Sequence, residues 1–423
     1  MMKLDEQAIA FNLDSPQSTN ASIDRLVSQL GPPVELLGLG EALHGGEEIL
    51  IFRNRLFQRL VERHGYSAIA IESSFTRGHL VNEYVAGCGS SSYEAVEEAG
   101  FSHGFGSLEA NRELVEWMRR YNADTSHSIK LQFYGFDAPT EMSHADSPRR
   151  VLHFVLDYLS ALDDARGNEY RECMESLIGR DRDWEDPATL FDPAKSIGLS
   201  AAARQLRIEV EDLIAELEAR RPELIAGSDK ERYCEAVHYA RLARWLLVYH
   251  AAMAKKGSQR TSRLLGIRDA CMADNLAYIL SCQQGRGRPL AFAHNSHLKK
   301  GRMQWQFGDE LFTWWPAGSH LKETLGQSYA VIGSAVGVSH ENGIGWPEAG
   351  SLEAMLMATP GPGRFVSTRW VQSLFDSEST APPVRSGSLK NTTYFPLTAN
   401  SLADFDWLVA LDRVRYSRGG PPL

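Results

Sequence analysis

The chain has 423 residues, of which 43% are hydrophobic and 23% charged, with 35 glycines and 18 prolines. This composition is typical of a globular protein and excludes a disordered, collagen-like or coiled-coil chain, and the length allows one α/β domain with insertions. The 44 Lys and Arg residues against 54 Asp and Glu residues give a formal charge of −10 without any basic run, so we expect no nucleic-acid partner.

The N-terminal stretch MMKLDEQAIAFNLDSP carries acidic residues where a signal peptide needs an apolar segment. The most apolar helical stretch, residues 245 to 254, is far too short to span a bilayer. The five cysteines are scattered and form no C-x-x-C pair, so neither a disulfide framework nor a zinc knuckle is predicted. We therefore expect a cytoplasmic protein without membrane contact.

Short apolar runs that end in glycine or polar residues are typical of buried strands. Helical patterns lie between these runs, and the first of them stops at His64-Gly65. Strands that alternate with helices predict an α/β fold with a mostly parallel sheet flanked by helices. The predicted strands cover residues 34–40, 67–72, 130–137, 289–295 and 329–334, with weaker candidates at RFVST and DWLVAL near the C-terminus.

Strand patterns disappear from about residue 147 to residue 275, where charged amphipathic segments such as AAARQLRIEVEDLIAELEARR replace them. Prolines break this stretch at several points and delimit individual helices. We therefore predict three parts: residues 1–146 as the first part of an α/β core, 147–275 as a large helical insertion, and 276–423 as the second part of the core with C-terminal wrapping loops.

Polar side chains follow several of the predicted strands at the point where each strand ends, which is where open α/β sheets bind ligands. The motifs of serine hydrolases, zincins, P-loop proteins and dinucleotide-binding proteins are absent from the sequence. We expect a group of carboxylates and imidazoles to meet at this edge of the sheet, formed by Glu41, His44, Glu72, Asp137, His294 and His297.

All six of these residues also have an ordinary structural interpretation as helix caps, turn caps or donors to the backbone. A carboxylate that ends the run AIAIE is costly to bury without a specific partner, which favours a functional role for Glu72. His44 stands beside Glu41 and two glycines, and this surrounding favours a catalytic role for its imidazole.

Two further residues are weaker candidates for binding or support. Arg53 falls on the apolar face of the first helical pattern. It could be a boundary arginine whose charge reaches water, or it could make a charge-assisted bond to Glu41 or Glu72. His103 stands in the glycine-rich stretch SHGFGS, where it could reach the cleft or lie on the surface.

The chain resembles the erythromycin esterase family in an ordered series of motifs. In GEALHGGEEILIFRNRLFQRLVERHGYSAIAIE, Glu41, His44 and Arg53 stand at the spacing of the family. The segments FYGFDAPTEMS, RDACMADN and AHNSHL, the last of which contains His297, follow in the same order. A distributed and ordered match of this kind is more specific than any single motif.

The resemblance implies a hydrolase that opens macrolide lactone rings by histidine-activated water, without a metal or another cofactor. It also implies an α/β core with a helical domain. Within this resemblance His44 matches the general base, Glu41 and Arg53 support it, and Glu72 and His294 are credited with catalysis. The implied partner is a small-molecule natural product, and the oligomeric state stays open.

This chemistry agrees with the properties of the side chains. A neutral imidazole with an ordinary pKa of about 6.5 can accept a proton from water near neutral pH, and an adjacent carboxylate would fix its tautomer. Arg53 or a second histidine could then stabilise the oxyanion of the tetrahedral intermediate. We also expect the helical insertion to cover this cleft and to form one of its walls.

Three alternatives of other classes stay open. The same glutamates and histidines could bind a divalent metal in a metal-dependent hydrolase. The protein could instead be a non-catalytic ligand-binding protein, although a binding surface does not need so many ionisable residues in one place. It could also be a biosynthetic tailoring enzyme that uses the same base for a cyclisation or an elimination.

Overall fold

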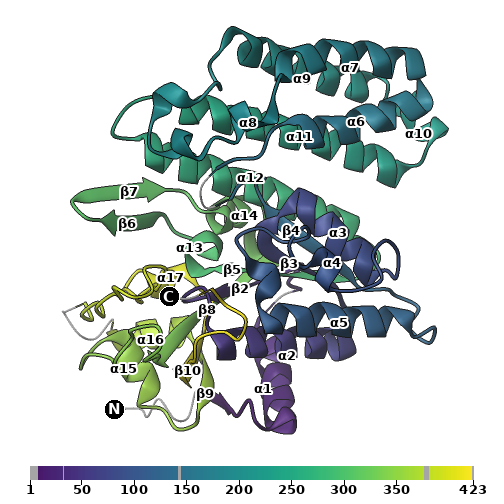
Figure 1. Ribbon diagram of the computed structural model, residues 1–423. Helices are drawn as coiled ribbons and strands as arrows, with labels where there is room; N and C mark the ends of the chain where they lie inside the picture. The colour runs from purple at the N-terminus through teal and green to yellow at the C-terminus, as the bar shows by residue number, and fades with distance from the viewer. Residues whose placement is uncertain (1–7, 32, 142–143, 376–380, 422–423) are drawn as a thin grey trace.

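The computed structural model describes residues 8–31, 33–141, 144–375 and 381–421. Its centre is an eight-stranded sheet in the order β1-β9-β10-β8-β2-β5-β3-β4, and β6 and β7 form a separate hairpin (Figure 1). The strands are β1 (Ile9–Phe11), β2 (Leu36–Glu41), β3 (Tyr66–Ser74), β4 (Gln132–Asp137), β5 (Arg288–His294), β6 (Met303–Phe307), β7 (Glu310–Trp314), β8 (Tyr329–Val338), β9 (Gly363–Ser367) and β10 (Trp407–Arg413).

The six strands from β10 to β4 in this order run parallel, and β9 and β1 complete one edge in antiparallel pairing. The fold-class prediction of a mostly parallel α/β sheet is therefore confirmed. All five apolar runs became strands of this sheet, and every residue of β2, β3 and β8 is buried. Strands covered by helices on both faces need such near-continuous apolar runs.

The weaker candidates RFVST and DWLVAL are β9 and β10. No pattern in the sequence predicted β1 or the hairpin of β6 and β7. With three residues, β1 is too short for a period-2 pattern to stand out. The hairpin follows the short helix α13 (Asn295–Leu298) and lies outside the main sheet, so no long buried run marks it.

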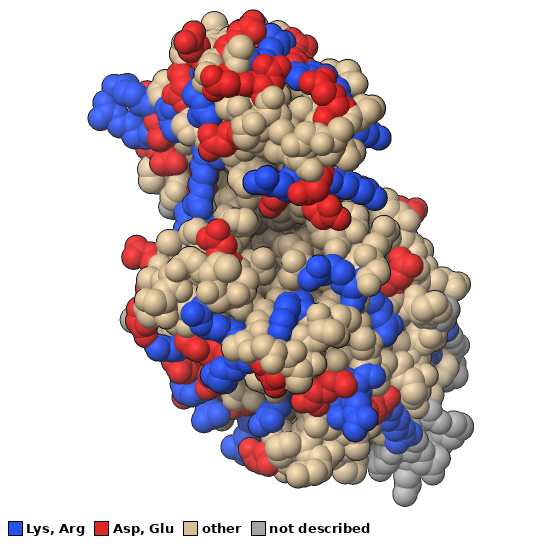
Figure 2. Space-filling model, turned by 90° about the vertical axis from the view of Figure 1, so that its right-hand side faces the viewer, with Lys and Arg blue, Asp and Glu red and all other residues tan. Residues whose placement is uncertain are grey.

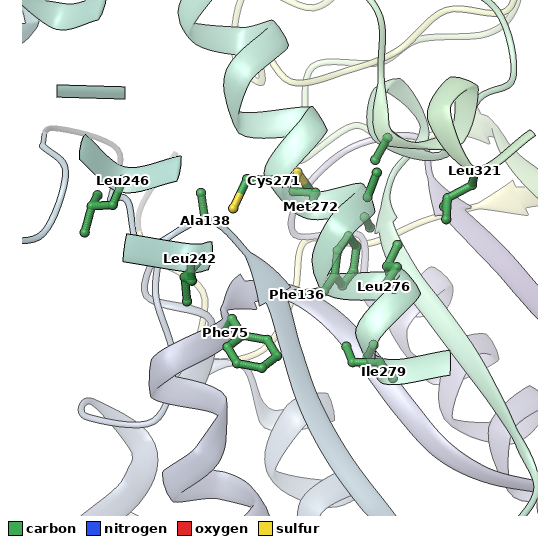
Figure 3. Packing of buried hydrophobic residues seen from close by; sticks show 14 of the residues in the cluster. Phe75, Phe136, Ala138, Leu242, Leu246, Cys271, Met272, Leu276, Ile279 and Leu321 are labelled. Carbon is green, nitrogen blue, oxygen red and sulfur yellow. The ribbon is translucent and has the colours of Figure 1, made fainter. Parts of the chain in front are cut away.

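Helices cover both faces of the sheet, and alternate strand residues feed two separate hydrophobic cores. One core includes side chains of α1, α2 and α5, while the other includes α12 and α14. Phe136 of β4 lies in the second core with Met272, Leu276 and Ile279 of α12 (Figure 3). The helices before β4 are α1 (Pro16–Gln29), α2 (Glu47–His64), α3 (Phe75–Val85), α4 (Glu94–Glu97) and α5 (Glu109–Ala123).

Between β4 and β5 the described residues form helices and no strand, and most of these helices form the layer at the top of Figure 1. They are α6 (Arg149–Leu162), α7 (Asp164–Ile178), α8 (Asp181–Trp184), α9 (Ala201–Ala219), α10 (Arg221–Gly227), α11 (Lys230–Met253) and α12 (Arg260–Cys282). The helical stretch runs seven residues past the predicted boundary at residue 275, to Cys282 at the end of α12 (282 − 275). α12 packs on β4 and β5 of the sheet. The division into three domains stays a prediction.

The C-terminal third adds α14 (Ala317–Leu325), α15 (Leu352–Met357), α16 (Thr368–Phe375), α17 (Ser401–Asp404) and long loops around β8, β9 and β10. The backbone of Phe395, in the last of these loops, donates to the carbonyl of Ala42 directly after β2. These loops therefore reach the edge of the sheet where the predicted site residues lie. In the described part of the chain no helix is both long enough and apolar enough to cross a membrane.

Candidate active site

The predicted site residues meet at the C-terminal edge of the parallel strands. Glu41 and His294 end β2 and β5 and lie opposite each other in the strand pairing. Glu72 lies in β3, and Asp137 ends β4. The ring centroids of His44 and His294 are 5.1 Å apart. The strand register thus brings together Glu41 and His294, which are 253 residues apart in the sequence (294 − 41).

His44 follows β2 and forms a pair with Glu41. Its Nδ1 lies 2.6 Å from Glu41 Oε1, and the side chains are 28% and 5% exposed, respectively. Because a carboxylate oxygen can only accept, Nδ1 carries the hydrogen and Nε2 keeps a lone pair. Nε2 makes no hydrogen bond within the described residues. Burial lowers the pKa of His44, but the carboxylates of Glu41 and Glu72 outweigh it and raise this pKa above its ordinary value.

The backbone after His44 turns sharply into α2. Gly45 has a φ of 77°, a left-handed conformation that favours glycine, and a side chain at this position would collide with the ring of Tyr416. The backbone of Ser417 also donates to the carbonyl of Gly45. The C-terminal segment therefore packs directly on the loop that carries His44.

His294 is a neutral imidazole with both nitrogens in hydrogen bonds. Its Nε2 lies 2.7 Å from the carbonyl oxygen of Thr393, and its Nδ1 lies 3.2 Å from the backbone nitrogen of Ser296. Since a carbonyl only accepts and a backbone N–H only donates, the hydrogen of the ring is on Nε2. Burial lowers the pKa of His294 to about 3, and the neighbouring His44 acts in the same direction. This ring has no free lone pair for proton abstraction.

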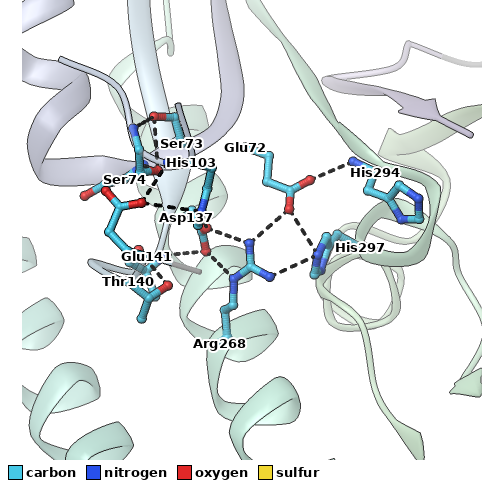
Figure 4. A network of polar contacts seen from close by, with 12 residues as sticks. Glu72, Ser73, Ser74, His103, Asp137, Thr140, Glu141, Arg268, His294 and His297 are labelled. Atoms are coloured by element: carbon cyan, nitrogen blue, oxygen red, sulfur yellow. Dashed lines mark hydrogen bonds and ion pairs between the residues drawn. The ribbon is translucent and has the colours of Figure 1, made fainter. Parts of the chain in front are cut away.

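Glu72 is the centre of a buried polar network (Figure 4). Its Oε1 lies 2.9 Å from Arg268 Nη2 and 3.2 Å from His297 Nε2, and its Oε2 accepts the backbone N–H of His294 at 2.8 Å. Burial raises the pKa of Glu72, but the nearby charges of His297, His44 and Arg268 hold it well below its ordinary value. Glu72 therefore carries a negative charge that the surrounding protein neutralises.

Asp137 extends the same network away from His44. It accepts hydrogen bonds from Arg268 Nε at 2.8 Å and Nη2 at 2.7 Å and is paired with His103 Nε2 at 2.9 Å. Burial opposes its ionisation, but Arg268 lowers the pKa of Asp137 to about 2. Among the described residues, His103 is the one non-glycine residue with a positive φ, 59°, and its backbone N–H donates to Glu141. His103 thus belongs to the network and does not lie on the open surface.

His297 forms the second histidine–carboxylate pair of the site. Its Nδ1 lies 2.8 Å from Asp269 Oδ1, and Asp269 also accepts from Trp314 Nε1 at 2.7 Å and from the backbone of Ala317 at 2.9 Å. Burial lowers the pKa of His297, but Asp269 and Glu72 outweigh it and raise this pKa to about 10. The raised pKa favours the protonated imidazole, whereas Arg268 Nη1, which lies 3.3 Å from His297 Nε2, opposes it.

Arg53 differs from both sequence-based expectations. It is 1% exposed, so it is not a boundary arginine, and it makes no ion pair with Glu41 or Glu72 within the described residues. Its guanidinium donates to Asn54 and Asn111, each at 2.7 Å, and burial lowers the pKa of Arg53 to about 10. Arg53 also lines a cavity of about 10 Å³ together with the two glutamates, which is room for about one water molecule.

Several residues of the site carried no prediction. Arg268 and Asp269 both come from α12 and begin the segment RDACMADN of the family resemblance, which gave neither residue a role in the site. Thr393 and Asn391 come from a C-terminal loop without any motif, and both contact the backbone of His44. α12 therefore supplies one wall of the site, and the C-terminal loop supplies another.

One group of donors could hold a metal ion. Glu41, His44 and Glu72 offer ligand atoms that lie within 4.8 Å of one another. Both oxygens of Glu72 already accept hydrogen bonds, however, and Arg268 and His297 neutralise its charge. Glu41 Oε2 is the one buried oxygen of this group without a partner in the described part of the chain. The charge of Glu72, one of the two carboxylates, is thus balanced by protein groups.

A groove of about 960 Å³ lies between α3, α4 and the helical layer, and its lining does not include Glu41, His44 or Glu72. Figure 2 shows the surface hollowed between the helical layer and the α/β body. Arg77 lines the groove and pairs with Glu141 at 2.7 Å, and Glu141 accepts from the backbone of His103. The groove has the size of a small-molecule site. Its other charged lining residues include Glu98, Asp146, Arg150, Asp157 and Glu185.

Comparisons with known proteins point to one family. A family model described as erythromycin esterase matches residues 61–414. Erythromycin esterase type II of Escherichia coli is 24% identical over 344 residues, which are 78% of this chain and 75% of that protein. A Bacillus cereus protein of solved structure has a TM-score of 0.76 at 18% identity, over 99% of this chain and 98% of that chain. A histidine-to-asparagine mutant of erythromycin esterase EreC, in its open conformation, has a TM-score of 0.68 at 18% identity, over 96% and 97% of the two chains.

Proposed function

Because the chain belongs to the erythromycin esterase family, we propose that it hydrolyses an ester or lactone with water activated by His44 and without a metal ion. The observation that carries this proposal is the pair of His44 and Glu41. The imidazole is partly exposed, its Nδ1 is bound to a buried carboxylate, and its Nε2 lone pair is open. A base for water needs this combination of orientation, raised basicity and access.

The reaction follows from these positions. His44 Nε2 takes a proton from water while the water oxygen attacks the carbonyl carbon of the ester, which gives a tetrahedral oxyanion and an imidazolium. Glu41 stabilises this imidazolium through Nδ1. When the intermediate collapses, the C–O bond to the alcohol breaks and the imidazolium returns its proton to the leaving oxygen. An opened lactone therefore gains one water in mass.

The other two histidines have different roles in this proposal. His294 is neutral and carries its hydrogen on Nε2, so it is a donor and not a base. His297 is held as a cation between Asp269 and Glu72. It adds positive charge to the site and keeps Glu72 ionised, and that carboxylate in turn raises the basicity of His44.

We propose a macrolide-type lactone, or another bulky natural-product ester, as the substrate. Family membership supports this class. The groove of about 960 Å³ under the helical layer has the size for such a ligand, and Arg77 and Glu141 link its wall to His103 of the polar network. The helical layer and α3 both line this groove, so movement of the helical layer would control access to it.

A metal-dependent hydrolase is the second candidate, and the closeness of Glu41, His44 and Glu72 favours it. In that case these three side chains would hold the ion, which would supply an activated water and charge stabilisation. The hydrogen bond from Arg268 to Glu72 and the ion pair of His297 with Glu72 favour the metal-free proposal, because they already neutralise one of the two carboxylates.

The proposal is tested by turnover of a panel of macrolides and simple aryl esters, followed by mass spectrometry, with and without a chelator. The expected result is a product heavier by one water, formed equally in both conditions. Chelator-sensitive activity that zinc or manganese restores would support the metal-dependent candidate. A product of unchanged mass but changed retention would indicate a tailoring reaction, and binding without turnover would indicate a ligand-binding protein.

A further inference from the structure

A short C-terminal loop contacts both histidines at the mouth of the site. Thr393 Oγ1 accepts the backbone N–H of His44 at 3.0 Å, and the carbonyl of Thr393 accepts His294 Nε2 at 2.7 Å. Asn391 Nδ2 donates to the carbonyl of His44 at 3.0 Å. We call residues 391–395 the clasp, because they hold the backbone of one histidine and the ring of the other.

The clasp is itself held in one arrangement. The hydroxyl and the backbone N–H of Thr393 both donate to Asn391 Oδ1, at 2.6 and 3.1 Å. The amide of Asn391 also donates to Asn342 at 2.8 Å, and Asn342 is completely buried. Phe395 closes the other end, where its backbone donates to Ala42 at 2.7 Å. The contacts with the histidines are therefore made by an ordered segment.

The directions of these hydrogen bonds fix the chemistry of the two rings. Thr393 Oγ1 uses its hydrogen for Asn391 and is left as an acceptor, which matches the N–H of His44. His44 is then bound at both its backbone N–H and its carbonyl, so its ring is aimed at Glu41. The carbonyl of Thr393 requires a hydrogen on His294 Nε2, which prevents His294 from competing as a base.

We propose that Thr393 is a positioning residue for hydrolysis, which holds His44 in the orientation of the base and His294 in the orientation of a neutral donor. This inference rests on the proposed function of His44 as the base. Thr393 does not contact the reacting atoms in this proposal and acts through the two histidines. Thr393 orients the His44–Glu41 pair most directly. The ionisable groups that face His44 are Glu41, Glu72, His294 and His297.

Three variants separate positioning from mere stability. Thr393→Val keeps the shape but removes the hydroxyl, whereas Thr393→Ser keeps the hydroxyl. Thr398→Val is the matched control in the same loop region, because the hydroxyl of Thr398 pairs with Ser401 and with neither histidine. We expect Thr393→Val to lower kcat about tenfold with KM changed by less than about twofold, and the other two variants to behave like the wild type.

A second readout needs no substrate. The ¹⁵N spectrum of the histidine rings is measured at a pH where His44 is neutral. The wild type and Thr393→Ser should show hydrogen on Nδ1 of His44 and on Nε2 of His294. In Thr393→Val the two nitrogen signals of His44 should move toward each other, because a less restrained ring exchanges between tautomers.

Equal losses in Thr393→Val and Thr393→Ser, or unchanged kinetics and spectra in Thr393→Val, would overturn the positioning role. A fall in melting temperature with unchanged kcat and an unchanged His44 tautomer would also overturn it. If the wild type hydrolyses no ester, the proposed function fails. The ring spectra then decide the role of the clasp on their own.

Discussion

The site contains two histidine–carboxylate pairs of similar length and opposite character. His44 lies 2.6 Å from Glu41, and His297 lies 2.8 Å from Asp269. The first imidazole is 28% exposed and has one open nitrogen, whereas the second is 5% exposed and has a second carboxylate, Glu72, at its other nitrogen. The pKa is raised in both rings, and for His297 it is raised to about 10.

This difference teaches that a histidine–carboxylate pair does not by itself make a base. A base must return to its neutral form at working pH, and a second carboxylate prevents this by stabilising the cation. We expect His297 instead to serve as a positive charge beside Glu72, together with Arg268. Experiments can therefore distinguish His44 with Glu41, which we call the open pair, from His297 with Asp269, which we call the buried pair.

The largest effect is expected at the open pair. His44→Ala should lower kcat by about 10² to 10⁴ because the general base is lost, while the protein stays folded. Steady-state hydrolysis and circular dichroism measure the two quantities. His79→Ala, at an exposed histidine on α3 that pairs with Glu83, is the matched control and should retain full activity. Full activity of His44→Ala would remove the distinction between the two pairs.

The buried pair should control stability. Glu72→Gln leaves Arg268 and His297 as buried charges without their shared partner, and loss of one member of such a network costs about 3 to 5 kcal/mol. Urea unfolding measures this loss. Glu83→Gln is the exposed control, with a side chain 44% accessible, and should cost less than about 1 kcal/mol. An unchanged free energy of unfolding in Glu72→Gln would mean that the network around Glu72 is not ionised.

The buried pair should also make stability depend on alkaline pH. Because the pKa of His297 is raised from about 6.5 to about 10, its contribution is complete below about pH 6.5 and is lost as the pH rises through about 10. Each pKa unit corresponds to roughly 1.4 kcal/mol. Urea unfolding at pH 7 and pH 10 should show a smaller fall in Asp269→Asn than in the wild type. Equal falls would contradict the assignment of His297 as a cation.

The smallest effect is expected from losing the hydrogen bond that Trp314 donates to Asp269 of the buried pair. Trp314→Phe removes the N–H that donates to Asp269 at 2.7 Å and keeps most of the apolar surface. We expect a loss of about 1 to 3 kcal/mol in unfolding free energy, since a charged acceptor loses one hydrogen bond. Thermal unfolding measures the change. Activity that falls more than stability would instead place Trp314 in the reaction itself.

The sequence predicted the strands of the site better than its loops. Apolar runs that end in Glu41, Glu72 and His294 carry local signals for both the strand and the site, and parallel pairing brings their ends together. Thr393 lies 349 residues after His44 in a loop without periodicity, so no local pattern can indicate that contact. Arg53 was placed correctly on an apolar helix face, but its amide partner Asn111 comes from another helix.

The central claim is that His44, with its basicity raised by Glu41, is the group that takes the proton from water. The most direct test is the acidic limb of kcat/KM against pH in the wild type and in Glu41→Gln. Activity must fall as His44 is protonated, so this limb should lie above the ordinary histidine pKa of about 6.5 in the wild type. It should move to lower pH in Glu41→Gln, because the carboxylate that raises the pKa is gone. A limb that stays in place in Glu41→Gln would contradict the claim.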